Sequence, residues 1–219
     1  MSDLKPVSRS DGRLIYLAGT SRSGKSRHAM VLASRHKRLL IWDPDDEWSS
    51  HGATRIDVND AARFRDICRR KTAGQYTFVA PATLEWFEFF CQCAWVWLRL
   101  YPGAVVVEEL ADVTSPGKAA GAWGMICRRG KKFGAWIYGI SQRPAECDKT
   151  AISNADEIHC HAVVRPVDQR YMAEFIGATQ DQVAALVPWQ HLSRLDIAQA
   201  PQLAGDIRPD LAQNLRTKP

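Results

Sequence analysis

One eight-residue stretch limits the folds open to this chain more than any other feature. A glycine, four variable residues and a Gly-Lys-Ser triplet follow one another as Gly19-Thr20-Ser21-Arg22-Ser23-Gly24-Lys25-Ser26. An apolar run from Arg13 to Ala18 precedes it, and a helix is predicted after it, from Lys25 to His36. Glycines let the backbone curl with its N–H groups pointing inward, and the N-terminus of a helix adds a positive dipole. The stretch therefore predicts a phosphate-binding loop between a strand and a helix.

Each position of this loop has a predicted role in nucleotide binding. All eight residues, from Gly19 to Ser26, are expected to surround the phosphates of ATP. The Lys25 ammonium can reach the β- and γ-phosphates, and the Ser26 hydroxyl can bind Mg²⁺. Such a loop alone does not distinguish a kinase from a GTPase or a motor.

The composition is that of an ordinary globular domain. The 219 residues include 46% hydrophobic and 24% charged side chains, which suits one α/β domain with short tails. We expect tails at residues 1–12 and 200–219 around a nucleotide-binding domain at residues 13–199. The net charge of +5 is compatible with a polyanionic partner but does not demonstrate one.

Strands and helices are predicted to alternate along the domain, which favours a mostly parallel sheet with helices on both faces. Besides the helix after the phosphate loop, helices are expected at 60–71, 84–100 and 117–129. The six expected strands are 13–18, 38–43, 76–80, 104–108, 135–140 and 157–164.

The segment from Leu84 to Leu100 is apolar at all but four positions, which calls for a check against a membrane span. The exceptions are two glutamates, a glutamine and an arginine that form a narrow polar stripe on a helix. Because the segment is short and charged, we expect a packed helix, partly at a subunit interface, and no stable membrane span.

The six cysteines include no C-x-x-C pair, so we expect reduced core residues in a cytoplasmic protein. His159-Cys160-His161 places two histidines on one face of a strand. No further ligand pair is spaced in the sequence to complete a tetrahedral zinc site, so a structural role is expected for these histidines.

Two carboxylates end the most hydrophobic strand, Val105-Val106-Val107-Glu108-Glu109. The carboxyl ends of parallel strands face the ligand crevice, so both are expected near the phosphates. We predict that Glu108 holds Mg²⁺ and that Glu109 orients and deprotonates an attacking water. Aspartate is usual at the position of Glu108, which leaves the division of the two roles open.

A third candidate element follows the fifth strand as Ser141-Gln142-Arg143-Pro144. Gln142 is predicted to lie near the γ-phosphate, where its amide can bind the phosphate or the attacking water.

Together these elements resemble the FtsK–HerA superfamily of DNA-pumping ATPases. Trp42-Asp43-Pro44 and the segment from Asn154 to Asp168 agree with that resemblance, which runs from about Arg13 to Leu195. The compact length looks most like the genome-packaging ATPases of tailless, membrane-containing icosahedral viruses.

The resemblance implies a RecA-like core in which the fifth strand lies between the strand of the phosphate loop and that of the two glutamates. It also implies a homo-oligomeric ring, hexameric or pentameric, with ATP between subunits and double-stranded DNA in the channel. Capsid vertex or portal proteins are implied partners, in the host cytoplasm or at the virion vertex. The resemblance places Arg128 or Arg129 as an arginine finger acting on the neighbouring subunit. A solvated basic turn is the alternative for these two residues.

Three other classes remain open from the sequence, and one of them is a non-enzymatic nucleotide-binding structural subunit. A small-molecule kinase also uses a phosphate loop, although the Glu108-Glu109 pair and the loop at Gln142 argue against it. An assembly or export ATPase like those of filamentous phages is the third, although this class is expected to carry a membrane segment.

Overall fold

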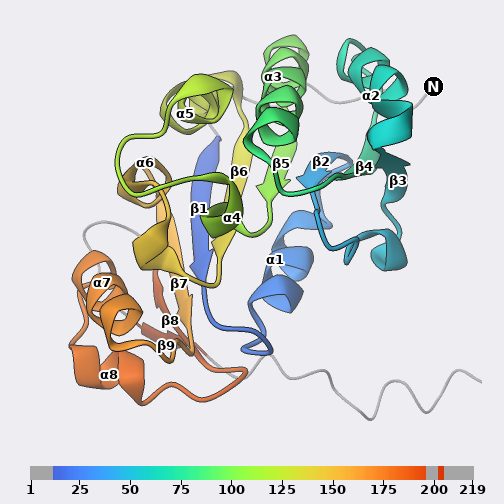
Figure 1. The fold of residues 1–219 in the computed structure, drawn as a ribbon. Helices are drawn as coiled ribbons and strands as arrows, with labels where there is room; N and C mark the ends of the chain where they lie inside the picture. Colours follow the sequence, from blue (N-terminus) through green and yellow to red (C-terminus); the bar gives the residue numbers. More distant parts are fainter. Residues whose placement is uncertain (1–11, 196–201, 205–219) are drawn as a thin grey trace, which may run out of the picture.

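The computed structural model describes residues 12–195 and 202–204, which contain one nine-stranded sheet (Figure 1). The strands are β1 Arg13–Ala18, β2 Arg38–Trp42, β3 Thr54–Asp57, β4 Gly74–Val79, β5 Ala104–Val107, β6 Trp136–Ser141, β7 Glu157–His161, β8 His191–Arg194 and β9 Gln202–Ala204. Their order across the sheet is β3-β4-β2-β5-β6-β1-β7-β8-β9. The first seven in this order are parallel, whereas β8 pairs with β7, and β9 with β8, in antiparallel fashion.

Helices cover both faces of this sheet, but unequally. On one face, α1 packs Ala29, Met30 and Ala33 against side chains of the central strands that include Ile15 and Leu17. The larger part of the core lies on the other face, where α2, α3, α5, α6 and α7 pack. The helices are α1 Lys25–Ala33, α2 Ala61–Cys68, α3 Leu84–Leu100, α4 Leu110–Val113, α5 Gly121–Arg129, α6 Lys149–Ser153, α7 Pro166–Ile176 and α8 Gln180–Ala184, with 3₁₀ turns at Ser49–His51, Val58–Asp60, Gly130–Phe133 and Pro144–Glu146.

The predicted fold class is confirmed. The sheet is mostly parallel, with helices on both faces, and β6 lies between β5 and β1 as the resemblance implied. The six predicted strands correspond to β1, β2, β4, β5, β6 and β7.

The predicted element bounds and inventory need correction. The helices predicted at 25–36, 60–71 and 117–129 are shorter, because α1 ends at Ala33, α2 covers 61–68 and α5 starts at Gly121. The prediction also lacked β3 and β8. Both have only four residues, and their polar side chains give little of the apolar pattern that identifies a strand.

Helix α3 has the predicted limits of 84 and 100 and packs within the domain. Phe87, Phe90 and Trp97 are among its buried side chains, and the Glu88 carboxylate accepts the backbone N–H of Ala122 at the start of α5. No helix in the described ranges is long and apolar enough to cross a membrane. All six cysteines are unpaired and buried, as expected for core residues.

The predicted tails fall almost wholly outside the described residues. Of residues 1–12 only Gly12 is described, and of residues 200–219 only the strand β9. This strand pairs with β8, so part of the predicted C-terminal tail extends the sheet.

Candidate nucleotide-binding site

Four neighbouring strands end at one edge of the sheet and bring the predicted site residues together. In the order β2-β5-β6-β1, all four strands are parallel, so their carboxyl ends meet at the same edge. The phosphate loop follows β1, Gln142 follows β6, and the glutamate pair follows β5. This edge is where ligands bind in open α/β sheets.

The phosphate loop has the backbone shape that its glycines predict. Gly24 has a φ of 98°, in the left-handed region, and immediately precedes α1. A Cβ on Gly19 would come within 2.5 Å of Ser23 Oγ and 2.6 Å of the His161 Cβ, so only glycine fits there. Among the described residues, the backbone N–H groups of Arg22, Gly24 and Lys25 donate to no protein acceptor. Free amides at the start of a helix form an anion-binding site.

Lys25, Glu109 and Gln142 form a connected polar group at the mouth of this loop. Lys25 Nζ lies 3.1 Å from Glu109 Oε1, and Gln142 Nε2 donates to the same oxygen at 2.7 Å. The lysine and glutamate side chains are only 6% and 12% exposed. Glu109 has a φ of 48°, an uncommon left-handed conformation that persists only where surrounding contacts hold it. Three residues far apart in the sequence thus share one hydrogen-bonding centre.

The neighbouring Glu108 is buried and has a different environment. It is 4% exposed, and its Oε1 accepts the indole N–H of Trp48 at 3.0 Å. Burial raises the pKa of the Glu108 carboxyl to about 8, against the opposing effect of Lys25. The two adjacent glutamates are therefore distinguished by their surroundings, since Glu109 pairs with a cation and Glu108 mainly with an indole.

Asp43 and Trp48 also belong to the site, although the sequence alone does not assign them to it. Asp43 is 1% exposed and accepts hydrogen bonds from the Trp48 N–H at 2.9 Å and from Thr77 Oγ1 at 2.9 Å. These bonds hold the loop after β2 so that Trp48 reaches Glu108. The sequence does show an acidic residue directly after β2, as it shows Glu108 directly after β5. Asp43 could be assigned to the site only once β2 and β5 were known to be neighbours in the sheet.

Carboxylates line a small cavity beside the phosphate loop. Such a set of oxygen atoms suits Mg²⁺, which prefers oxygen ligands and keeps several waters. Ser26, in the first turn of α1, is the predicted hydroxyl ligand. The cavity is lined by Asp43, Pro44, Asp45, Glu47, Glu108 and Glu109.

The two candidate finger residues lie at the opposite edge of the sheet. Arg128 and Arg129 end α5, and the chain then turns into the start of β6, far from the phosphate loop (Figure 1). Arg128 Nη1 donates to the Ala119 carbonyl at 3.0 Å. Arg129 lines an open hollow with the basic Arg99 and Lys132 and with aromatic side chains. Neither arginine can serve the phosphate loop of its own chain.

Known proteins resemble this chain in sequence and in fold. No family model matches the chain. The chain is similar to Protein P9 of Pseudoalteromonas phage PM2, with 29% identity over 190 residues, which are 83% of this chain and 85% of Protein P9.

Solved structures share the fold, and two of them illustrate the likeness. One is the genome packaging NTPase B204 from Sulfolobus turreted icosahedral virus 2 in complex with AMPPCP, with a TM-score of 0.73, 17% identity, and coverage of 91% of this chain and all of that one (100%). The other is VirB4 of Thermoanaerobacter pseudethanolicus, with a TM-score of 0.64, 12% identity, and coverage of 94% and 92%.

Proposed function

We infer that this chain, a homologue of Protein P9 of phage PM2 with the fold of the FtsK–HerA-type ATPases, is an ATP-hydrolysing motor that packages double-stranded DNA into a viral capsid. Residues 13–199 form its ATPase domain in this proposal. Support for the packaging role comes from the likeness to the fold of the B204 packaging NTPase, and support for a viral setting comes from the likeness to a phage protein.

The observation that carries the proposal is the contact of Lys25 and Gln142 with one carboxylate oxygen of Glu109, beside an anion-binding loop. A carboxylate in this place suits transfer of the γ-phosphoryl group to water. It can accept a proton from a water molecule that it also orients.

The same contact suggests how nucleotide binding prepares the site. Lys25 Nζ lies 3.1 Å from Glu109 Oε1. The phosphates of ATP are a stronger partner for this cation, and the free amides at Arg22, Gly24 and Lys25 add to their attraction. In our proposal Lys25 turns to the phosphates, which frees the Glu109 carboxylate to bind water. Gln142 then positions that water or reports the γ-phosphate.

Ser26 and Glu108 are the proposed ligands of Mg²⁺, directly or through water. The environment of Glu108 supports this role. Burial raises the pKa of its carboxyl and so disfavours the charged form, whereas a bound dication would favour the charged form. When bound, Mg²⁺ neutralises charge that develops on the phosphates.

The position of Arg128 and Arg129 is compatible with a finger that acts on a neighbouring subunit in a ring. Of the two, we favour Arg129. Arg128 already donates to Ala119 within its own chain, whereas Arg129 borders a hollow that a neighbouring surface could fill. A finger of this kind supplies positive charge to the transition state and couples hydrolysis to assembly.

Steady-state ATP hydrolysis with and without linear double-stranded DNA, at several protein concentrations, tests the proposal. We expect DNA to stimulate turnover, and the stimulation to steepen with protein concentration as rings form. The Lys25→Ala variant measures background activity. Turnover that ignores both DNA and protein concentration would contradict the motor and indicate a monomeric enzyme with another substrate.

A further inference from the structure

Four histidines, His28, His159, His161 and His191, gather where α1 packs against the antiparallel strands β7 and β8, next to the phosphate loop. His161 is paired directly with His191 across the antiparallel strands, and His159 with Ser193. Side chains two residues apart on a strand share a face, so His159, His161, His191 and Ser193 lie on one side of the β7–β8 strand pair. His28 of α1 contacts them from above, with its ring centroid 4.5 Å from that of His191. The sequence shows only the pair on β7, and the fold brings in His28 and His191.

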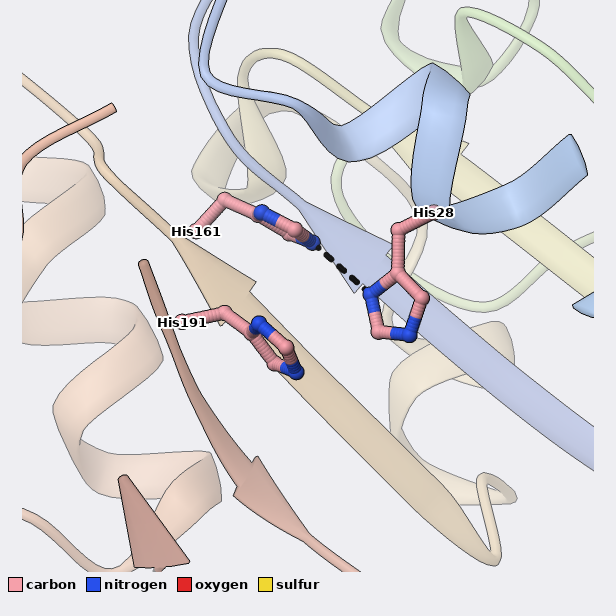
Figure 2. Close-up of side chains that lie close together, drawn as sticks. All are labelled: His28, His161 and His191. Atoms are coloured by element: carbon pink, nitrogen blue, oxygen red, sulfur yellow. Dashed lines mark hydrogen bonds between the residues drawn. The ribbon is translucent and has the colours of Figure 1, made fainter. Parts of the chain in front are cut away.

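The rings of His28, His161 and His191 converge on one another (Figure 2). His28 Nδ1 and His161 Nε2 are 3.1 Å apart. One nitrogen from each of the three rings can be chosen so that all three lie within 4.8 Å of one another. The His161 and His191 rings are stacked, with centroids 4.8 Å apart and planes inclined by 23°. His159 stands beside this group and is already engaged, since its Nδ1 lies 2.7 Å from Ser193 Oγ.

The group is buried, and its polar atoms are poorly satisfied. His161 is fully buried, His191 is 4% exposed and His28 is 9% exposed. Within the described residues, Nδ1 of His161 and Nδ1 of His191 have no hydrogen-bond partner, and neither does Ser23 Oγ in the adjacent phosphate loop. Buried polar atoms are rarely left unpaired, so the cluster has a cost in stability that hydrogen bonds inside the protein do not offset.

Burial also keeps these imidazoles neutral. It lowers the pKa of His28 to about 3 and that of His191 to about 4, and repulsion from neighbouring histidines adds to the effect. The pKa of His161 is lowered to about 2 for the same reasons. A neutral imidazole has a free lone pair, which is the form that binds a metal ion.

We propose that His28, His161 and His191 bind one transition-metal dication of the zinc class, which ties α1 to the antiparallel strand pair β7–β8. Imidazole nitrogen suits zinc, whereas Mg²⁺ takes oxygen ligands, so this site is chemically distinct from the one at Glu108. Zinc–nitrogen bonds of about 2.0–2.1 Å place two ligands of a tetrahedral ion roughly 3.3 Å apart. The His28–His161 pair is already near that spacing, and side-chain rotation can bring in His191. Water completes the coordination.

Such an ion would hold the phosphate loop in place from behind. His28 lies in the first turns of the helix that the loop precedes, and Gly19 packs against His161. The backbone N–H of Trp189, just before β8, also donates to the Ser23 carbonyl at 2.9 Å. The metal would add a second link between the same two parts of the chain, and this role does not depend on the proposed ATPase activity.

Metal analysis of the untagged full chain tests this proposal. Protein grown with zinc should carry about one equivalent per chain by elemental analysis. After chelation, Co²⁺ should bind in the same ratio with the intense visible bands of a tetrahedral ion, and zinc should displace it. Added zinc should raise the melting temperature of the metal-free protein.

Matched variants locate the ion. His161→Ala with His191→Ala should abolish the Co²⁺ bands, and His28→Gln, at the edge of the cluster, should weaken binding by more than about 100-fold. His159→Gln and Glu108→Gln should leave the Co²⁺ spectrum and stoichiometry unchanged. The proposal is overturned if the folded wild-type chain binds neither ion stoichiometrically. It is equally overturned if Glu108→Gln removes the bands while His28→Gln keeps them.

Discussion

Glu109→Gln tests the proposed chemistry most directly, because it removes one charge and almost no volume. The glutamine oxygen can still accept hydrogen bonds from Lys25 and Gln142, which now lie 3.1 Å and 2.7 Å from Glu109 Oε1. We therefore expect the variant to fold normally. What it lacks is a carboxylate that can accept a proton from the attacking water.

The structure sets opposite expectations for hydrolysis and for binding. Loss of a general base lowers the rate by about 10²–10⁴-fold, or about 3–5 kcal/mol of activation free energy. ATP binding should instead be equal or tighter, because Lys25 no longer has to leave a carboxylate that is 12% exposed. Replacing a charge-assisted contact by a neutral one is worth on the order of 1 kcal/mol, so affinity should rise by up to about fivefold.

Both quantities can be measured on one preparation. Phosphate release gives the turnover rate, and fluorescence titration with a labelled ATP analogue gives the dissociation constant. Glu146→Gln is a matched control, since Glu146 is an exposed glutamate that pairs with Arg165 outside the site, and its variant should hydrolyse ATP normally. A Glu109→Gln protein that keeps more than about a tenth of the wild-type rate would refute the assignment. If Glu108→Gln causes the loss instead, the two glutamates have exchanged roles.

The remaining predictions concern the lysine, the buried glutamate and the two arginines. Lys25→Ala should abolish nucleotide binding or turnover. An unchanged hydrolysis rate would contradict the proposal that the phosphate loop binds the ATP that is hydrolysed. Because the pKa of Glu108 is raised to about 8 in the folded protein, its contribution to stability is present below its ordinary pKa and is lost as pH rises towards 8. In EDTA and without nucleotide, the melting temperature of Glu108→Gln should therefore equal that of wild type near pH 5 and exceed it by several degrees near pH 9. The same difference in melting temperature at both pH values would contradict a buried carboxyl without a cationic partner. When Arg129→Ala chains are mixed with wild-type chains, the rate of ATP hydrolysis should fall by more than the fraction of variant chains, and Arg128→Ala should have the same effect more weakly. A loss of activity in proportion to that fraction would argue against a finger acting between subunits.

Local patterns were enough for much of the fold. Helix α3 has its predicted limits because Thr83 caps its start and a long apolar pattern continues to Leu100. The strands β1 and β5 were predictable because buried parallel strands are continuous runs of apolar residues. Short polar strands were not predicted, because they contain no such run. The exposed edge strand β3, Thr54–Asp57, contains a single buried residue.

The sequence by itself determined the phosphate loop and its neighbours, because the geometry of that loop depends on residues within eight positions of one another. The alternation of strands and helices also predicted the carboxyl edge of the sheet as the place for Glu109 and Gln142. The contacts of Lys25 and Gln142 with Glu109 depend on β6 lying between β5 and β1, which the family resemblance implied and local periodicity did not.

Only the tertiary structure decided the environment of each side chain. Trp48 meets Glu108 because β2 adjoins β5, and this burial separates the two consecutive glutamates chemically. His28 meets His161 because β7 adjoins β1, and His191 joins them because the antiparallel strand β8, unpredicted from its polar sequence, pairs with β7. Contacts between residues on different elements leave no local periodic signal, since they follow from the order in which strands pack and not from the spacing along any one of them.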